Sequence, residues 1–171
     1  GIVSILSFFN ILYSYYFNLY LNLDTYYFTL LTSFILFIVL FKFGKYDFKS
    51  NIFDKILTIF LGYLLIPLVL SIPFYFSIYN LTFSNSFFEA ISGFTSTGFT
   101  VFENIKLIDQ SLIIWRSSTQ WIGGLYFLFS IIYLIDIYDD SFKKTLTNFI
   151  SFNSSEILKQ AAKIFILYSL L

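Results

Sequence analysis

Stretches without any charged residue alternate with short charged connections along this chain. Four of them stand out, at residues 1–23, 25–41, 56–88 and 117–135. A membrane-spanning helix needs about 20 consecutive apolar residues, and a charge near the bilayer centre is costly. The pattern therefore predicts an all-α membrane protein that crosses the bilayer several times, with one more helix beginning near Lys163.

The third stretch is too long for a single span. As one straight helix it would be about 50 Å long, whereas the hydrocarbon core is about 30 Å thick. Asn80 and Asn85 favour a turn within it, so we predict a helix over residues 54–79 and a separate element after it. Pro67 and Pro73 should kink this helix, because membrane helices tolerate proline when neighbouring groups satisfy the freed carbonyls.

Composition supports the membrane class and excludes several kinds of chemistry. Only 12% of the residues are charged and 58% are hydrophobic, whereas soluble domains carry about 25% charged residues. Ten basic residues balance ten acidic ones, so the chain has no basic surplus for binding nucleic acid. The absence of Cys and His excludes disulfides, thiol nucleophiles, Cys/His zinc sites and histidine acid–base catalysis.

The lysines predict the orientation of the helices. Cytoplasmic connections of membrane proteins carry an excess of Lys and Arg. We therefore expect a cytoplasmic N-terminus and an extracytoplasmic segment at residues 80–116. Eight of the ten positive charges lie in the two connections that would be cytoplasmic, at Lys42, Lys45, Lys49, Lys55, Lys143, Lys144, Lys159 and Lys163.

Residues 84–102 are too apolar for a solvated loop and too short to span, which favours a re-entrant or interfacial element. Ser86 and Glu89 have the spacing of a capping box, so we predict a helix over residues 86–94 with Glu89 reaching back to its start. Direct attraction of an ion is the alternative role for Glu89, since ionisable groups in apolar segments are often functional.

Residues 95–100, Thr-Ser-Thr-Gly-Phe-Thr, should leave the helix. Non-helical backbone at membrane depth is tolerated only where it is buried in protein or lines water. Its carbonyls could replace the hydration shell of a monovalent cation, as in selectivity filters, and Gly98 can adopt the positive φ that turns its carbonyl inward. The preceding helix would aim its partly negative C-terminus at the ion. The alternative is a Ser/Thr-rich extracytoplasmic turn.

Two motifs stand out in the second half of the chain, where residues 92–100 read SGFTSTGFT and residues 115–124 read WRSSTQWIGG. Together they resemble the first pore repeat of the TrkH/KtrB (Trk/Ktr/HKT) potassium-transport family. The corresponding family patterns are S-G-F-T-T-T-G in the pore loop and W-R-S-x-x-Q-W-x-G-G in the next helix. This chain departs from the family at Ser96, where threonine is common, and at residues 125–127, where smaller residues are usual.

The resemblance implies three regions. Residues 1–45 would be a leading pair of transmembrane helices, residues 46–137 the first helix–pore-loop–helix repeat, and residues 138–171 a cytoplasmic linker with the start of the second repeat. We therefore expect the chain to be the N-terminal part of a longer transporter with four repeats. The repeat would contain a helix at 54–79, a pore helix at 86–94, a filter at 95–100 and a helix at 109–137.

The resemblance also implies potassium uptake across the bacterial inner membrane, as a channel or as a symporter coupled to Na⁺ or H⁺. It implies a homodimer in lipid with a cytoplasmic nucleotide-binding regulatory subunit, and neither enzymatic activity nor an organic cofactor. Backbone carbonyls of Thr95, Ser96, Thr97 and Gly98 would bind K⁺. The complete filter would be Thr95, Ser96, Thr97, Gly98, Phe99 and Thr100, with Ser86, Glu89, Arg116, Gly123 and Gly124 in support.

Several residues have competing interpretations. Asp136, Asp139 and Asp140 could hold Mg²⁺ and a diphosphate in an intramembrane prenyltransferase-like enzyme, although a solvated helix end explains them more simply. A non-transporting membrane scaffold is a third hypothesis. Arg116 either anchors its helix at the interface or pairs with Glu103 or Asp109. The pair Gly123-Gly124 should let helices approach closely.

Overall fold

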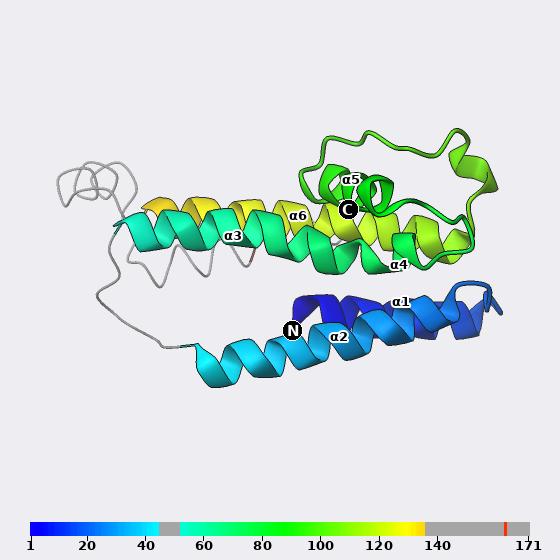
Figure 1. Ribbon diagram of the computed structural model, residues 1–171, viewed down its shortest axis with the longest axis horizontal. Coiled ribbons are helices and arrows are strands. Elements are labelled where there is room, and N and C mark those ends of the chain that lie inside the picture. The colour runs from blue at the N-terminus through cyan, green and yellow to red at the C-terminus, as the bar shows by residue number, and fades with distance from the viewer. Residues whose placement is uncertain (45–51, 136–162, 164–171) are drawn as a thin grey trace. The chain divides into compact units, whose positions relative to one another are not determined.

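The computed structural model describes residues 1–44, 52–135 and 163 (Figure 1). This part of the chain is helical and contains no β-strand. The site discussed below lies within one of two compact units, formed by Gly1–Lys49 and Phe60–Gly124. The elements are α1 (Ile2–Tyr16), α2 (Leu23–Phe43), α3 (Ile52–Leu70), α4 (Ile72–Tyr75), α5 (Phe83–Phe94), the 3₁₀ turn η1 (Ile105–Leu107) and α6 (Gln110–Ile135).

Two segments among the described residues are long and apolar enough to cross a membrane. They are α2 and the segment Phe53–Tyr75, which covers α3 and α4. Helix α1 is apolar but shorter. The predicted all-α membrane class is confirmed. Of the predicted last helix, only Lys163 is described, and it is helical.

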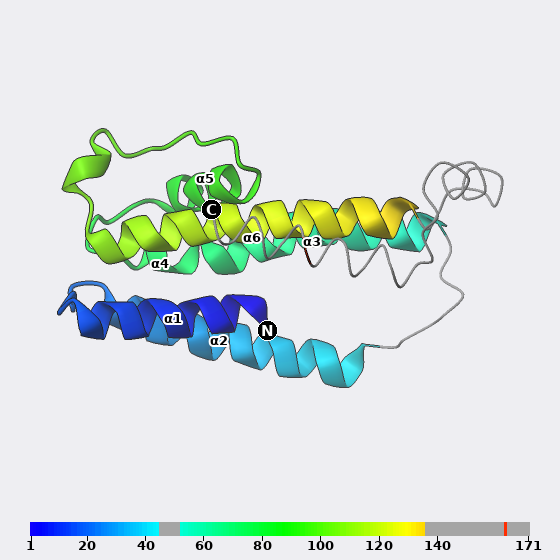
Figure 2. The ribbon, with the colours of Figure 1, turned by 180° about the vertical axis from the view of Figure 1, so that it is seen from behind.

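Helices α1 and α2 lie side by side (Figure 2). Their outer faces expose large apolar side chains, and Ser4 and Ser33 bridge them through their hydroxyls at 2.9 Å. Membrane helices typically pack through small and polar residues because lipid solvates the apolar ones. The buried polar side chains of the pair include Ser7, Asn10, Ser14, Thr25, Thr29 and Ser33.

Helix α1 ends earlier than the charge-free stretch suggested. It stops at Tyr16 because Asn18 adopts a left-handed conformation, with φ of 56°. The Leu19 N–H then donates to the carbonyl of Ser14 at 2.8 Å. Asn tolerates this conformation at a helix C-terminus better than most residues. Apolar character therefore continues beyond the last helical residue.

The predicted helix over residues 54–79 is also corrected. Helix α3 continues through Pro67, but the chain turns at Ser71 and restarts as α4 with Pro73 in its first turn. Proline lacks the N–H that would continue the previous helix, yet its φ suits a helix start. The carbonyl of Leu70, at the end of α3, accepts a hydrogen bond from Trp115 Nε1 at 3.0 Å.

The start of α5 differs from the prediction as well. It begins at Phe83, and the Thr82 side chain caps it by accepting from the Asn85 N–H at 3.3 Å. The capping box at Ser86 and Glu89 is therefore wrong. Ser86 lies in the first turns of the helix and donates to the Thr82 carbonyl at 3.0 Å.

Candidate functional site

Helix α5 and the chain that follows it form a short element that packs closely on α6. With 12 residues, α5 is about 18 Å long, well short of a bilayer core of about 30 Å. A Cβ on Gly123 would lie 1.7 Å from the Phe94 carbonyl oxygen, and one on Gly93 would lie 2.0 Å from Thr119 Oγ1. These two glycines therefore allow the contact. Gly124 has open space instead.

The chain after α5 folds back onto the end of its own helix. The Thr95 N–H donates to the Ile91 carbonyl at 2.8 Å, and the Ser96 N–H donates to the Gly93 carbonyl at 2.9 Å. These bonds satisfy carbonyls that a helix C-terminus leaves without intrahelical partners. Ser96 takes the left-handed φ of 57°, which is uncommon for a residue other than glycine.

The N–H groups of Thr97 and Gly98 also point to the end of α5. They lie 3.0 and 3.5 Å from the Ser92 carbonyl oxygen. Gly98 has φ of +78°, and a Cβ built on it would meet no atom within 4 Å. The constraint on Gly98 is therefore conformational rather than steric, because L-residues with a side chain rarely adopt this φ.

Ser92 fastens the segment through its side chain. Its hydroxyl donates to the Phe99 carbonyl at 2.7 Å and lies 3.1 Å from Thr97 Oγ1. Thr97 Oγ1 in turn donates to the Ser92 carbonyl at 3.1 Å. Sequence reasoning did not single out Ser92. Its signals were its place in the last turn of a short helix and its position at the start of the motif at residues 92–100.

Glu89 is fully buried and binds the far end of the loop. Its carboxylate accepts from Thr100 Oγ1 at 3.0 and 3.1 Å and from the Val101 N–H at 3.0 Å. Arg116 Nε donates to the same carboxylate at 2.5 Å. A buried charge needs an opposite charge and hydrogen bonds to offset its desolvation, and Glu89 has both.

Arg116 also contacts the predicted filter. Its Nη2 donates to the carbonyls of Gly98 at 3.1 Å and Phe99 at 3.3 Å. The predicted pairing with Glu103 or Asp109 is therefore wrong, whereas the role as an interfacial anchor stays a prediction. No local sequence pattern could reveal the real partner, because Glu89 lies on a different helix.

The predicted filter residues differ in what surrounds them. Residues 95–99 are exposed and Thr100 is half-buried. In the described part of the chain, no group donates a hydrogen bond to the carbonyls of Thr95, Ser96 and Thr97. The Gly98 carbonyl, by contrast, accepts one from Arg116. The site thus combines unpaired carbonyls with bound ones.

The alternative metal site cannot be described in the same way. Asp136, Asp139 and Asp140 lie outside the described residues. Within those residues there is no group of three or more His, Cys, Asp or Glu side chains suited to a metal ion.

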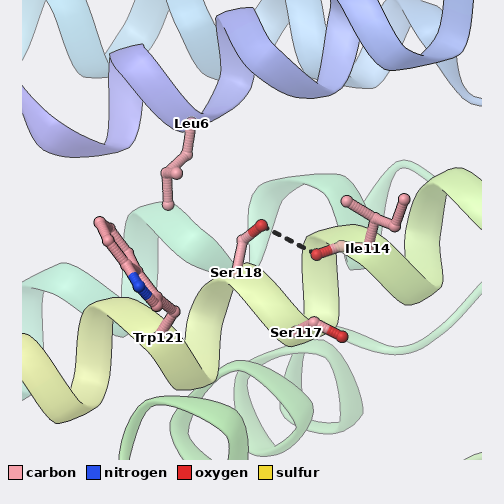
Figure 3. A pocket seen from close by; sticks show the side chains of 5 residues that line it. All are labelled: Leu6, Ile114, Ser117, Ser118 and Trp121. Carbon is pink, nitrogen blue, oxygen red and sulfur yellow. Dashed lines mark hydrogen bonds between the residues drawn. The ribbon is translucent and has the colours of Figure 1, made fainter. Parts of the chain in front are cut away.

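A pocket is lined by residues of α1 and α6 (Figure 3). The Ser118 hydroxyl there donates to the Ile114 carbonyl at 2.8 Å, and that of Ser117 donates to the Ile113 carbonyl at 3.1 Å. Its hydroxyls are therefore already bonded within their own helix. The lining residues are Leu6, Ile114, Ser117, Ser118 and Trp121.

Comparison with known proteins finds several relatives among transporters. An uncharacterised cation transporter of Methanocaldococcus jannaschii is 35% identical over 65 residues, which is 38% of this chain and 14% of that protein. The potassium uptake protein TrkI of Halomonas elongata is 37% identical over 60 residues, which is 35% of this chain and 11% of TrkI. TrkG of Escherichia coli is 29% identical over 106 residues, which is 57% of this chain and 22% of TrkG.

No family model and no solved structure matches the chain. The aligned part covers less than a quarter of each of these three relatives. Each of these relatives is nevertheless named as a cation transporter or a potassium uptake protein. These relatives and the helical architecture support the resemblance of this chain to part of the TrkH/KtrB family.

Proposed function

We propose that this chain provides one strand of a potassium-selective pore, within a Trk-type uptake protein. The strand is residues 95–100, and its backbone carbonyls take the place of water around K⁺. One strand cannot surround an ion, so the other strands come from other repeats of the transporter. The exposure of residues 95–99 suits a surface that those repeats cover.

One observation carries the proposal. Three successive carbonyls, at Thr95, Ser96 and Thr97, belong to exposed residues and accept no hydrogen bond from the described residues. They come directly after a helix too short to cross a membrane. Unpaired carbonyls in a largely apolar chain are costly in lipid. Coordination of a dehydrated cation would satisfy them. The C-terminal end of α5 adds a partial negative charge beside them.

The wider assembly is proposed on the resemblance and on the names of the relatives. K⁺ is the substrate, transported with or without coupling to Na⁺ or H⁺, and the chain is not an enzyme. The full transporter is a multi-pass homodimer of the bacterial inner membrane with a cytoplasmic N-terminus and a nucleotide-binding regulatory subunit.

Substitution of two glycines tests the filter assignment. Gly98→Ser and Gly124→Ser are introduced into the complete gene that encodes this chain, and uptake is measured in a potassium-auxotrophic host. Both sites have room for a side chain, but only Gly98 has a positive φ. We expect Gly98→Ser to lower the preference for K⁺ over Na⁺ and Gly124→Ser to leave it unchanged. Equal selectivity in both variants would refute the assignment.

A further inference from the structure

We infer that Arg116, neutralised by Glu89, sets which carbonyls of the strand face the ion. On this inference the carbonyls of Thr95, Ser96 and Thr97 bind the cation, while the guanidinium holds that of Gly98 away from it. This rests on the proposed function, and it differs from the prediction that Gly98 contributes its carbonyl directly. Arg116 is thus a positioning residue.

Peptide geometry determines the direction of the carbonyls of Thr95, Ser96 and Thr97. The N–H groups of Ser96, Thr97 and Gly98 all point to carbonyls in the last turn of α5. The described residues contain no cis peptide, and a trans peptide places its C=O opposite its N–H. The carbonyl that precedes each of these N–H groups therefore points away from α5.

The carbonyls of Gly98 and Phe99, unlike these three, already accept hydrogen bonds. Arg116 Nη2 donates to both, and the Ser92 hydroxyl donates to Phe99 as well. A carbonyl bound by a guanidinium already has a positive charge beside it. A second cation at the same oxygen would be repelled, so these two carbonyls are poor ligands for K⁺.

Glu89 makes a cation acceptable so close to the pore. An isolated guanidinium beside the strand would repel K⁺. The Glu89 carboxylate, whose Oε1 lies 2.5 Å from Arg116 Nε, neutralises that charge. Arginine suits this position because its planar fork offers five donors in fixed directions. It can bind the carboxylate and the two carbonyls at once. A lysine ammonium keeps the charge but cannot reproduce that geometry.

The first test compares Arg116→Lys with Lys106→Gln, an exposed charge in η1, in the complete gene. Folded protein is measured by gel filtration after detergent extraction, and selectivity by the ratio of K⁺ to Na⁺ uptake. We expect both variants to fold and Arg116→Lys to lose about tenfold in the ratio, the usual scale of one charged hydrogen bond. A purely structural ion pair would leave the ratio unchanged and overturn the inference.

A double variant keeps the test decisive if lysine prevents folding. Glu89→Gln with Arg116→Gln removes both charges at similar volume and leaves no unpaired buried charge. The inference predicts folded protein with lowered selectivity. Folded protein with the wild-type ratio would overturn it. In either case Gly98→Ser separates the two proposals, since unchanged selectivity in that variant contradicts the filter itself.

The second test needs no variant. The full-length protein is labelled with ¹³C at backbone carbonyls, and solid-state NMR spectra are recorded in KCl and in choline chloride. The inference predicts that K⁺ shifts the carbonyl signals of Thr95, Ser96 and Thr97 and leaves that of Gly98 in place. A shift of Gly98 as large as that of Thr97 would overturn the inference but would support the filter. No shift at any of them would contradict both.

Discussion

Two polar regions of this apolar chain differ in how their hydrogen bonds are used. In the junction of α2 with α6, the hydroxyls of Tyr26 and Ser111 lie 3.0 Å apart. Asn22 donates to Asp109 at 3.2 Å and accepts from the Ile78 N–H at 3.2 Å. In the loop after α5, successive carbonyls have no donor from the described residues. In the first region, which we call closed, these polar groups bond to one another. In the second, which we call open, carbonyls are left without a donor from the described residues.

The difference separates polar groups that hold the fold from groups available to a ligand. A buried polar group with its partners stabilises helix packing, and losing one partner is costly. The N–H groups of Ser96, Thr97 and Gly98 point to α5, and among the described residues no group donates to the carbonyls of Thr95, Ser96 and Thr97. Variants of the junction should therefore change stability alone. Variants of the loop and its supports should also change ion selectivity.

The largest effect is expected at Glu89, which supports the open region. Glu89→Ala leaves Arg116 without its counter-charge and releases Thr100 and Val101 from the loop end. Removing one partner of a buried pair costs about 3–5 kcal/mol, so little folded protein and no selective uptake should remain. Glu103→Ala removes an exposed carboxylate and serves as the control. Normal extraction and gel filtration of Glu89→Ala would contradict this role.

Gly123→Ala should have the next largest effect because it separates α5 from α6. The new methyl group would overlap the Phe94 carbonyl oxygen, and overpacking of this kind typically costs about 1–3 kcal/mol. Gly124→Ala, with open space around it, should keep the wild-type thermal unfolding midpoint in detergent. If both variants unfold at the same temperature, α5 does not dock as described.

Tyr26→Phe tests the closed region. It removes a buried hydroxyl that bonds Ser111, which should lower the free energy of unfolding by about 1 kcal/mol. The K⁺/Na⁺ uptake ratio should not change. Tyr16→Phe, at a side chain that is 80% exposed, should alter neither quantity. A loss of selectivity in Tyr26→Phe would end the distinction between the two regions.

The smallest effect concerns the start of α5. Thr82→Ala removes the observed cap and should destabilise the protein by about 0.5–1 kcal/mol. Ser84→Ala, at an exposed neighbouring hydroxyl, is the matched control and should be near neutral. Denaturant unfolding in detergent distinguishes them. Equal stabilities would mean that Thr82 does not cap this helix.

Much of the fold could be predicted because charge-free stretches of suitable length have few alternatives to membrane helices. Local interruptions were harder. The turn at Asn18 ends α1 within an apolar run, and Ser71 divides the predicted helix between two prolines. Both depend on backbone conformations that hydrophobicity does not report.

The site was predictable only where its chemistry is local. The positive φ of Gly98 follows from the properties of glycine, but the same sign at Ser96 had no signal. Glu89 was misread because its spacing from Ser86 fits a capping box, whereas its actual partner Arg116 is on another helix. Local rules fail here because a tertiary ion pair has replaced a local cap.

A structure of the full-length protein in a rubidium salt tests the central claim most directly. Anomalous scattering identifies the ion without relying on its surroundings. The account predicts an ion in contact with the carbonyl oxygens of Thr95, Ser96 and Thr97, with Arg116 still bound to the carbonyl of Gly98. An ion held elsewhere while these carbonyls face solvent, or residues 95–100 wound into a continuous helix, would contradict it.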